Sequence, residues 1–238
     1  MKLLYYIPNT LTLLNLFFGC VAVVYGLNGD LKTLALFVLL GMLCDFFDGF
    51  FARLLKIKSK LGSQLDSLSD LVTFGMSSSV VIFVLLNNST FIIQNSQNTY
   101  IQLIPFLSFL ITIASSYRLA KFNLDDNGSY FKGLPTPANA LLIVFMPFLL
   151  NNEFTIQYVW LLENIFFLMF LIFSSIFFLN CKIKMFSFKA KSLTFDNTNK
   201  IEFLFLLISI ILLIIFNLGA LPLIIIIYII INLFRIKF

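Results

Sequence analysis

The sequence predicts an all-α protein that crosses a membrane several times. Its 238 residues are 60% hydrophobic and only 11% charged, and their mean hydropathy is +1.00. This composition is far from that of soluble domains. Several apolar runs approach the roughly 20 residues that a helix needs to cross the hydrocarbon core of a bilayer. The basic residues also fall on alternate connections between these runs, which is typical of polytopic membrane proteins.

Eight apolar runs are candidate transmembrane helices. They lie near residues 10–27, 33–52, 66–87, 101–121, 136–150, 156–180, 201–217 and 219–234. The fifth run is short for a span. We expect a single membrane domain over residues 1–238, with its core at about 1–180 and an additional two-helix hairpin at about 201–234.

The distribution of Lys and Arg predicts the orientation. All basic residues except Lys32 fall on one alternate set of connections. Because basic residues concentrate in cytoplasmic loops, we expect both termini in the cytoplasm and an even number of crossings. The net charge of +5 then reflects topology and attraction to anionic membrane lipids, and it requires no nucleic-acid partner.

Residues 45–70, DFFDGFFARLLKIKSKLGSQLDSLSD, hold four of the 11 acidic residues. Asp45 and Asp48 end one apolar run, and Asp66 and Asp70 begin the next, across a basic connection. Within each pair the spacing is three or four positions, so the two carboxylates share a helical face. Two antiparallel helices joined by a short loop can bring these faces together. We therefore expect the four carboxylates to converge at the cytoplasmic edge of the membrane.

Four carboxylates at one site repel one another unless a cation compensates them. Arg53 can offset about one charge, and one or two divalent ions suit the rest. All-oxygen ligands favour Mg²⁺, Mn²⁺ or Ca²⁺ over zinc or copper. The small residues Gly49, Ala52 and Gly62 lie nearby and allow a bulky ligand such as a nucleotide to approach the backbone.

Two other interpretations of this stretch are available. A structural one pairs Asp45 or Asp48 with Arg53 and assigns the later acids to a helix N-terminus. An ion-coupled transporter would also carry acids in its helices, but no paired helix breaks or inverted repeat are evident. The absence of histidine excludes a Ser-His-Asp triad and a His-ligated zinc site, so a general base is expected to be a carboxylate.

The pattern resembles the signature of the CDP-alcohol phosphatidyltransferase family, with every fixed position filled. It reads Asp45-x2-Asp48-Gly49-x2-Ala52-Arg53-x8-Gly62-x3-Asp66-x3-Asp70. Members of that family are polytopic enzymes that transfer a phosphatidyl-type group from a CDP-linked donor to an alcohol and release CMP. The resemblance implies a homodimer in the cell's inner membrane, with its active site on the cytoplasmic side.

The resemblance also implies roles for individual residues. Two divalent ions, Mg²⁺ or Mn²⁺ with Ca²⁺ as an alternative occupant, would be held by Asp45, Asp48 and Asp66. Asp70 would lie beside them as a metal ligand, the general base, or both. The residues implied to line the CDP pocket are Gly49, Ala52, Arg53, Gly62 and Ser63.

The N-terminal stretch IPNTLTLLN carries a polar stripe along an apolar helix. Family members often begin this helix with a similar Pro-Asn-x-x-Thr run that faces the nucleotide, which implies Asn9 and Thr12 as CDP contacts. Alternatively, Asn9 caps the helix, while Thr12 and Asn15 form interhelical hydrogen bonds.

The acceptor is expected to bind near Arg118 and Lys121, which lie one helical turn apart. Arg suits planar anions and Lys a point contact, so they could hold the lipid phosphate or an acceptor carboxylate. Alternatively, both anchor a helix end at the membrane surface.

The runs RLAKFN and GLPTPA resemble the phosphatidylserine synthase branch of the family. That resemblance implies CDP-diacylglycerol as the donor, L-serine as the acceptor, and membrane lipids as the surroundings. A sister enzyme that uses glycerol 3-phosphate, phosphatidylglycerol or inositol phosphate shares the catalytic stretch and stays an alternative.

Overall fold

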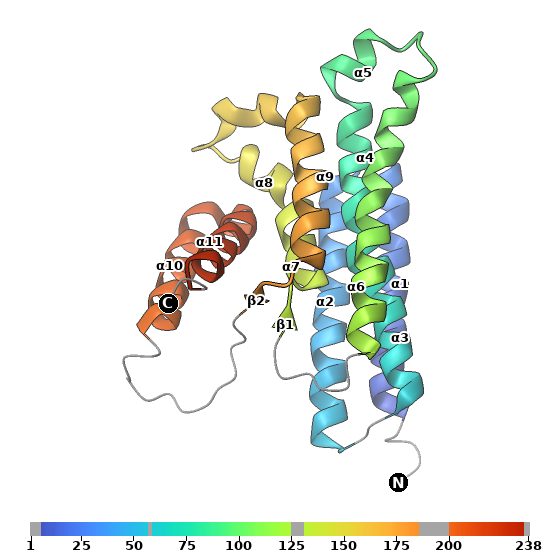
Figure 1. Cartoon of the computed structure of the whole chain (residues 1–238), viewed down its shortest axis with the longest axis vertical. Helices are drawn as coiled ribbons and strands as arrows, with labels where there is room; N and C mark the ends of the chain where they lie inside the picture. The colour runs from blue at the N-terminus through green and yellow to red at the C-terminus, as the bar shows by residue number, and fades with distance from the viewer. Residues whose placement is uncertain (1–5, 57–58, 125–130, 186–199, 236–238) are drawn as a thin grey trace.

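In the part of the chain that the structure describes, the protein is a bundle of helices with one very short strand pair (Figure 1). The structure is a computed structural model that describes residues 6–56, 59–124, 131–185 and 200–235. Some of the basic residues that predict orientation lie outside the described residues: Lys2, Lys58, Lys189, Lys191 and Lys237.

Helices α1 (Ile7–Leu27) and α2 (Leu31–Leu54) form an antiparallel pair (Figure 1). Pro8 lies in the first turn of α1, where the amide hydrogen that it lacks has no helical partner. Asp30 caps α2 by accepting hydrogen bonds from the Thr33 amide (3.0 Å) and hydroxyl (2.6 Å). These bonds stabilise the ionised carboxylate and lower the pKa of Asp30.

The next helix is continuous over Lys60–Asn87. It consists of α3 (Lys60–Asp70), the π-helix η2 (Leu71–Met76) and α4 (Ser77–Asn87). It begins before the apolar run predicted near 66–87, because Ser59 caps it by accepting a hydrogen bond from the Gly62 amide (3.2 Å). The π-helix follows Asp70 directly, and such wide turns occur frequently at functional sites.

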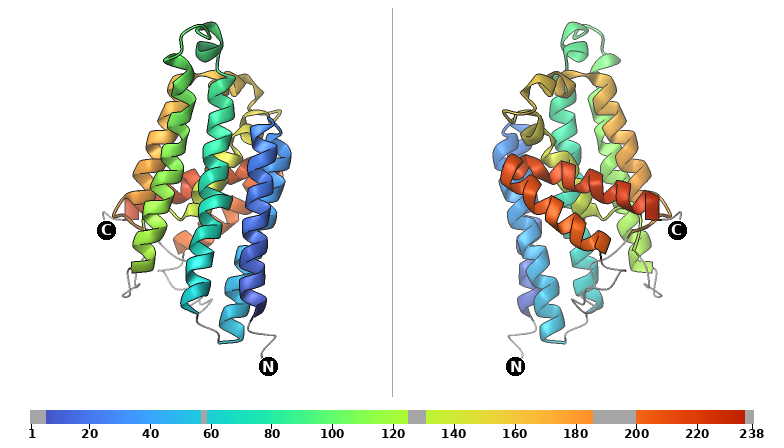
Figure 2. Two further views of the ribbon diagram at one scale, coloured as in Figure 1. Left: turned by 90° about the vertical axis from the view of Figure 1, so that its right-hand side faces the viewer. Right: turned by 90° about the vertical axis from the view of Figure 1, so that its left-hand side faces the viewer.

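The remaining elements complete the bundle. In chain order they are α5 (Thr90–Gln94), η3 (Ile101–Phe109), α6 (Leu110–Leu124), β1 (Phe131–Lys132), α7 (Thr136–Val144), α8 (Met146–Leu150), η4 (Ile156–Glu163), α9 (Ile165–Asn180), β2 (Lys184–Met185), α10 (Lys200–Phe216), η5 (Asn217–Gly219) and α11 (Ala220–Arg235). β1 and β2 pair antiparallel. The hairpin of α10 and α11 lies obliquely across one side of the bundle (Figure 2), where α11 packs on α7.

The multi-pass, helical architecture is confirmed. Among the described residues, five helices are long and apolar enough to cross a membrane, or six if η4 and α9 form one span. The count of eight and the orientation of the termini stay predictions.

The run predicted at 156–180 is not one straight helix, because η4 and α9 are bent by 79°. Asn164 causes the break: it has an extended backbone and caps α9 by accepting hydrogen bonds from the amides of Phe166 and Phe167. The run at 136–150 also forms only a short apolar helix.

Packing in the core of the bundle brings one end of α1, of α2 and of α3 together. Fully buried side chains such as Phe74, Val80 and Leu86 pack in its centre. The N-terminal end of α1, the C-terminal end of α2 and the N-terminal end of α3 lie together at one end of the bundle (Figure 1).

Candidate active site

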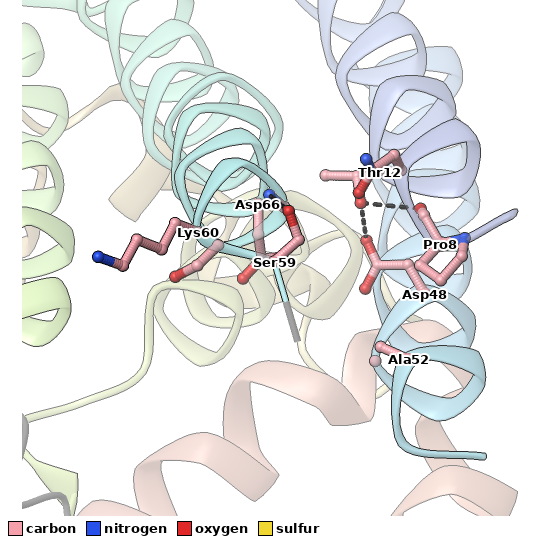
Figure 3. Close-up of a pocket in the computed structure, with 11 residues that line it drawn as sticks. Pro8, Thr12, Asp48, Ala52, Ser59, Lys60 and Asp66 are labelled. Atoms are coloured by element: carbon pink, nitrogen blue, oxygen red, sulfur yellow. Dashed lines mark hydrogen bonds between the residues drawn. The ribbon is translucent and has the colours of Figure 1, made fainter. Parts of the chain in front are cut away.

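A cavity of about 650 Å³ opens where these three helix ends meet. Its lining residues are Pro8, Asn9, Thr12, Asp48, Gly49, Ala52, Ser59, Lys60, Gly62, Ser63 and Asp66. Asp48 on α2 and Asp66 on α3 lie on opposite sides of it (Figure 3). Every residue expected to contact CDP lines the cavity except Arg53, which is exposed on the last turn of α2.

Three carboxylates cluster at this cavity, and two of them, Asp48 and Asp66, line it. Asp45, Asp48 and Asp66 each place one oxygen so that all three oxygens lie within 4.8 Å of one another. The Nε–H of Arg53, which was expected to offset this charge, donates to the Gly49 carbonyl (2.9 Å). A cluster of carboxylate oxygens at this spacing is the donor set that Mg²⁺, Mn²⁺ and Ca²⁺ prefer. These residues therefore fit a divalent metal ion.

Asp70 lies next to this trio rather than within it. It is only 8% exposed and its carboxyl group lies against Asp45, but it does not line the cavity. Its Oδ1 accepts a hydrogen bond from the Asn15 amide of α1 (3.4 Å). The structure thus brings together all four carboxylates of the motif: Asp48 and Asp66 line the cavity, and Asp45 and Asp70 lie beside them.

Helix α1 supplies polar groups to this end of the bundle. The Thr12 hydroxyl lies 2.5 Å from Oδ2 of Asp48 and 3.0 Å from the Pro8 carbonyl (Figure 3). Thr12 is 3% exposed, so it orients Asp48 while it lines the cavity. Asn9, one turn before Thr12 on α1, also lines the cavity, and its Oδ1 lies close to Gly62.

The sequence did not point to Ser59 and Lys60 as lining residues. Both lie in the unspecified stretch of the motif before Gly62. Ser59 was recognisable as a candidate N-cap residue, because a serine just before a helix often accepts a hydrogen bond from an amide two or three positions later. Here that amide belongs to Gly62. No pattern separates Lys60 from the other lysines of this connection, and its side chain extends away from Asp48 (Figure 3).

The two cations expected to bind the acceptor lie in different environments. Arg118 is 8% exposed, and its Nε has no hydrogen-bond partner among the described residues. Its guanidinium is close enough to Asp70 for the two charges to interact. Lys121, one turn further along α6, is exposed. Of these two residues, only Arg118 therefore lies inside the bundle, where it can contact a bound acceptor.

Comparison with known proteins agrees with this geometry. The family model for CDP-alcohol phosphatidyltransferase matches residues 5–174, which include every residue of the site described above. The chain belongs to this family. It is therefore a phosphatidyltransferase that acts on a CDP-linked donor, in a family that uses divalent metals.

Similar proteins carry a more specific name. The CDP-diacylglycerol--serine O-phosphatidyltransferase of Bacillus subtilis is 32% identical over 151 residues, which cover 61% of this chain and 77% of that protein. The Helicobacter pylori (strain J99) protein of the same name is 30% identical over 63% of this chain and 60% of its own length. The Saccharomyces cerevisiae one is 31% identical over 60% of this chain and 54% of its own length. The chain therefore spans little more than half the length of the latter two.

Proposed function

We propose that the protein transfers the phosphatidyl group of CDP-diacylglycerol to L-serine and releases CMP, at the cytoplasmic face of the cell's inner membrane. The observation that carries the proposal is the trio of clustered carboxylates, two of which line the cavity, with Asp70 and the buried Arg118 beside it. The names of the similar proteins described above support serine as the acceptor.

The cavity suits the CDP end of the donor. The first turn of α3 lines it, and the unpaired amides of a helix N-terminus favour phosphate groups. A divalent ion held by Asp45, Asp48 and Asp66 would neutralise charge on the pyrophosphate oxygens.

The remaining chemistry is a displacement at phosphorus. The serine hydroxyl oxygen attacks the phosphorus that carries diacylglycerol, and the bond from that phosphorus to the bridging oxygen breaks. CMP leaves with the bridging oxygen and its electron pair. The hydroxyl proton passes to the Asp70 carboxylate, which lies beside the trio and can act as the general base. Positioning of the two substrates supplies much of the rate in such transfers.

Serine-dependent CMP release is the decisive test. Purified protein in detergent is given CDP-diacylglycerol and Mn²⁺ or Mg²⁺, with L-serine, glycerol 3-phosphate, inositol phosphate or phosphatidylglycerol in parallel. Metal-dependent release with serine alone supports the proposal. Release with another alcohol alone would keep the catalytic stretch and overturn the choice of acceptor. The mass of the detergent-solubilised protein tests the homodimer that we also propose, and a monomeric mass would contradict it.

Gly49→Ala is expected to weaken donor binding without destabilising the fold. A Cβ at Gly49 would meet only Nη2 of Arg53, at 4.0 Å, so it would point into open space at the cavity. Alanine also favours a helix interior over glycine by about 0.5–1 kcal/mol. We expect the KM for CDP-diacylglycerol to rise about tenfold, which is about 1.4 kcal/mol, while the thermal midpoint stays the same or rises.

Gly26→Ala is the matched control, because a Cβ there would collide with Leu34 and come within 2.7 Å of Val80. It should lower the thermal midpoint. An unchanged donor KM in Gly49→Ala would show that Gly49 does not face the donor.

Arg118→Gln is expected to raise the KM for serine. If the protein has the proposed function, the Arg118 guanidinium binds the serine carboxylate. A hydrogen bond to a charged group contributes about 1.5–3 kcal/mol to binding. The KM should therefore rise about 10- to 100-fold, and Arg118→Lys should restore part of the affinity. Steady-state kinetics with serine as the varied substrate measure both. Lys121→Gln is the paired variant, and a larger effect there would transfer the acceptor role to Lys121.

A further inference from the structure

Asn15 on α1 contacts Asp70, the carboxylate of the motif that lies outside the trio. Its side chain is fully buried, and its Nδ2 lies 3.4 Å from Oδ1 of Asp70. Thr12, one turn earlier on α1, makes the corresponding contact with Asp48. The first helix therefore donates one hydrogen bond to a carboxylate of α2 and another to a carboxylate of α3.

The helix that carries Asp70 holds α1 in place on either side of this contact. The Ser69 hydroxyl donates to the Thr12 carbonyl (2.9 Å), and the Thr73 hydroxyl donates to the Asn15 carbonyl (2.9 Å). Both donors are buried. These two hydrogen bonds, from consecutive turns of that helix, thus fix the backbone of Asn15 relative to Asp70.

Helix α2 also packs closely against the side chain of Asn15. A Cβ at Gly41 would lie 2.8 Å from Oδ1 of Asn15 and 2.6 Å from Cγ2 of Thr73. The backbone of α2 therefore approaches the amide closely, and the side chain has little room to turn. Its Oδ1 has no hydrogen-bond partner among the described residues, so the only hydrogen bond that this buried amide makes there is the one to Asp70.

This arrangement has a chemical consequence for Asp70. The amide must present its N–H end to an ionised carboxylate, because its oxygen would repel that charge. The bond occupies Oδ1 and restricts rotation of the carboxylate, which leaves Oδ2 to receive a proton. A general base acts efficiently only when it is held within hydrogen-bonding reach of the proton that it removes.

We propose that Asn15 is a positioning residue that orients Asp70 for proton transfer from the acceptor hydroxyl. The inference rests on the proposed function, because it takes Asp70 as the base. The alternative is that Asn15 only packs the α1–α3 contact. The two differ in kinetics: loss of positioning lowers kcat with substrate binding unchanged, whereas loss of packing lowers the thermal midpoint without a selective effect on kcat.

The experiment compares two variants of the full-length protein. Asn15→Leu keeps the number and branching of the side-chain heavy atoms and removes the donor. Asn15→Ser is the second variant in case leucine prevents folding, because serine can bond to its own helix but is too short to reach Asp70. We expect kcat to fall about 10- to 100-fold, as it does when groups that orient an active-site residue are removed. The KM for serine and the metal-dependent binding of CDP-diacylglycerol should change less than about twofold.

Thr112→Val is the matched control. It removes another interhelical hydrogen bond, between Thr112 and Ser79 (2.7 Å), with little change in volume and far from any carboxylate of the motif in sequence. It should retain full kcat. A folded Asn15 variant with normal kcat, or one that loses donor binding in parallel, would overturn the positioning role. If the wild-type protein releases no CMP with any acceptor, the proposed function itself fails; if it uses another alcohol, the variants are compared with that alcohol.

Discussion

Asp70→Asn is expected to abolish turnover and to leave CDP-diacylglycerol binding largely intact. General-base catalysis contributes about 10²- to 10⁴-fold to rate, and an amide cannot accept the proton. Asp70 neither lines the cavity nor belongs to the trio of carboxylates, so donor binding should survive. The substitution preserves volume, and the new amide oxygen can still accept the hydrogen bond from Asn15. CMP release and equilibrium binding of the donor measure the two effects separately.

Asp30→Asn provides the matched control for this change. Asp30 caps the other end of α2, and asparagine is an equally good N-cap residue. Its turnover should equal that of the wild-type protein. Retained turnover in Asp70→Asn would remove Asp70 as the base, whereas joint loss of turnover and donor binding would identify it as a metal or donor ligand.

Much of this site was predictable from the sequence, because its paired carboxylates lie only three or four positions apart along the chain. Residues three or four positions apart must share a helical face, so the pairing of Asp45 with Asp48 and of Asp66 with Asp70 followed from helix geometry alone. The short basic connection then allowed the two faces to meet. Apolar runs predicted the long helices in the same way, because a run of sufficient length needs no knowledge of its neighbours.

Features that depend on single polar residues or on distant contacts were not predicted. Asn164 breaks the run at 156–180 through its own capping hydrogen bonds, within a segment that is otherwise mostly apolar. The interhelical hydrogen bonds of Asn15 are with residues more than 50 positions away. Asn15 was recognisable as a polar residue on an apolar helix, but its partner was not, since the register of α1 against α3 is fixed by packing.

Divalent cations are expected to stabilise the wild-type protein much more than the Asp66→Asn variant. The oxygens of Asp45, Asp48 and Asp66 lie within 4.8 Å of one another and repel when all three groups are ionised. A ligand that binds only the folded state at about 100 times its Kd adds about 2.7 kcal/mol to the free energy of unfolding. Replacing one carboxylate with an amide removes a metal ligand and one repelling charge together.

The order of the two thermal midpoints should therefore reverse with the metal. In EDTA, Asp66→Asn should unfold at the same temperature as the wild-type protein or higher, because one repulsion is gone. With Mn²⁺ or Mg²⁺ the wild-type protein should be the more stable, and only it should bind CDP-diacylglycerol in a metal-dependent manner. Asp30→Asn removes a carboxylate outside the trio and should follow the wild-type protein. An equal rise in midpoint for wild-type and Asp66→Asn proteins would place the cation elsewhere, whereas a reversal requires that the same carboxylates both repel one another and bind the ion.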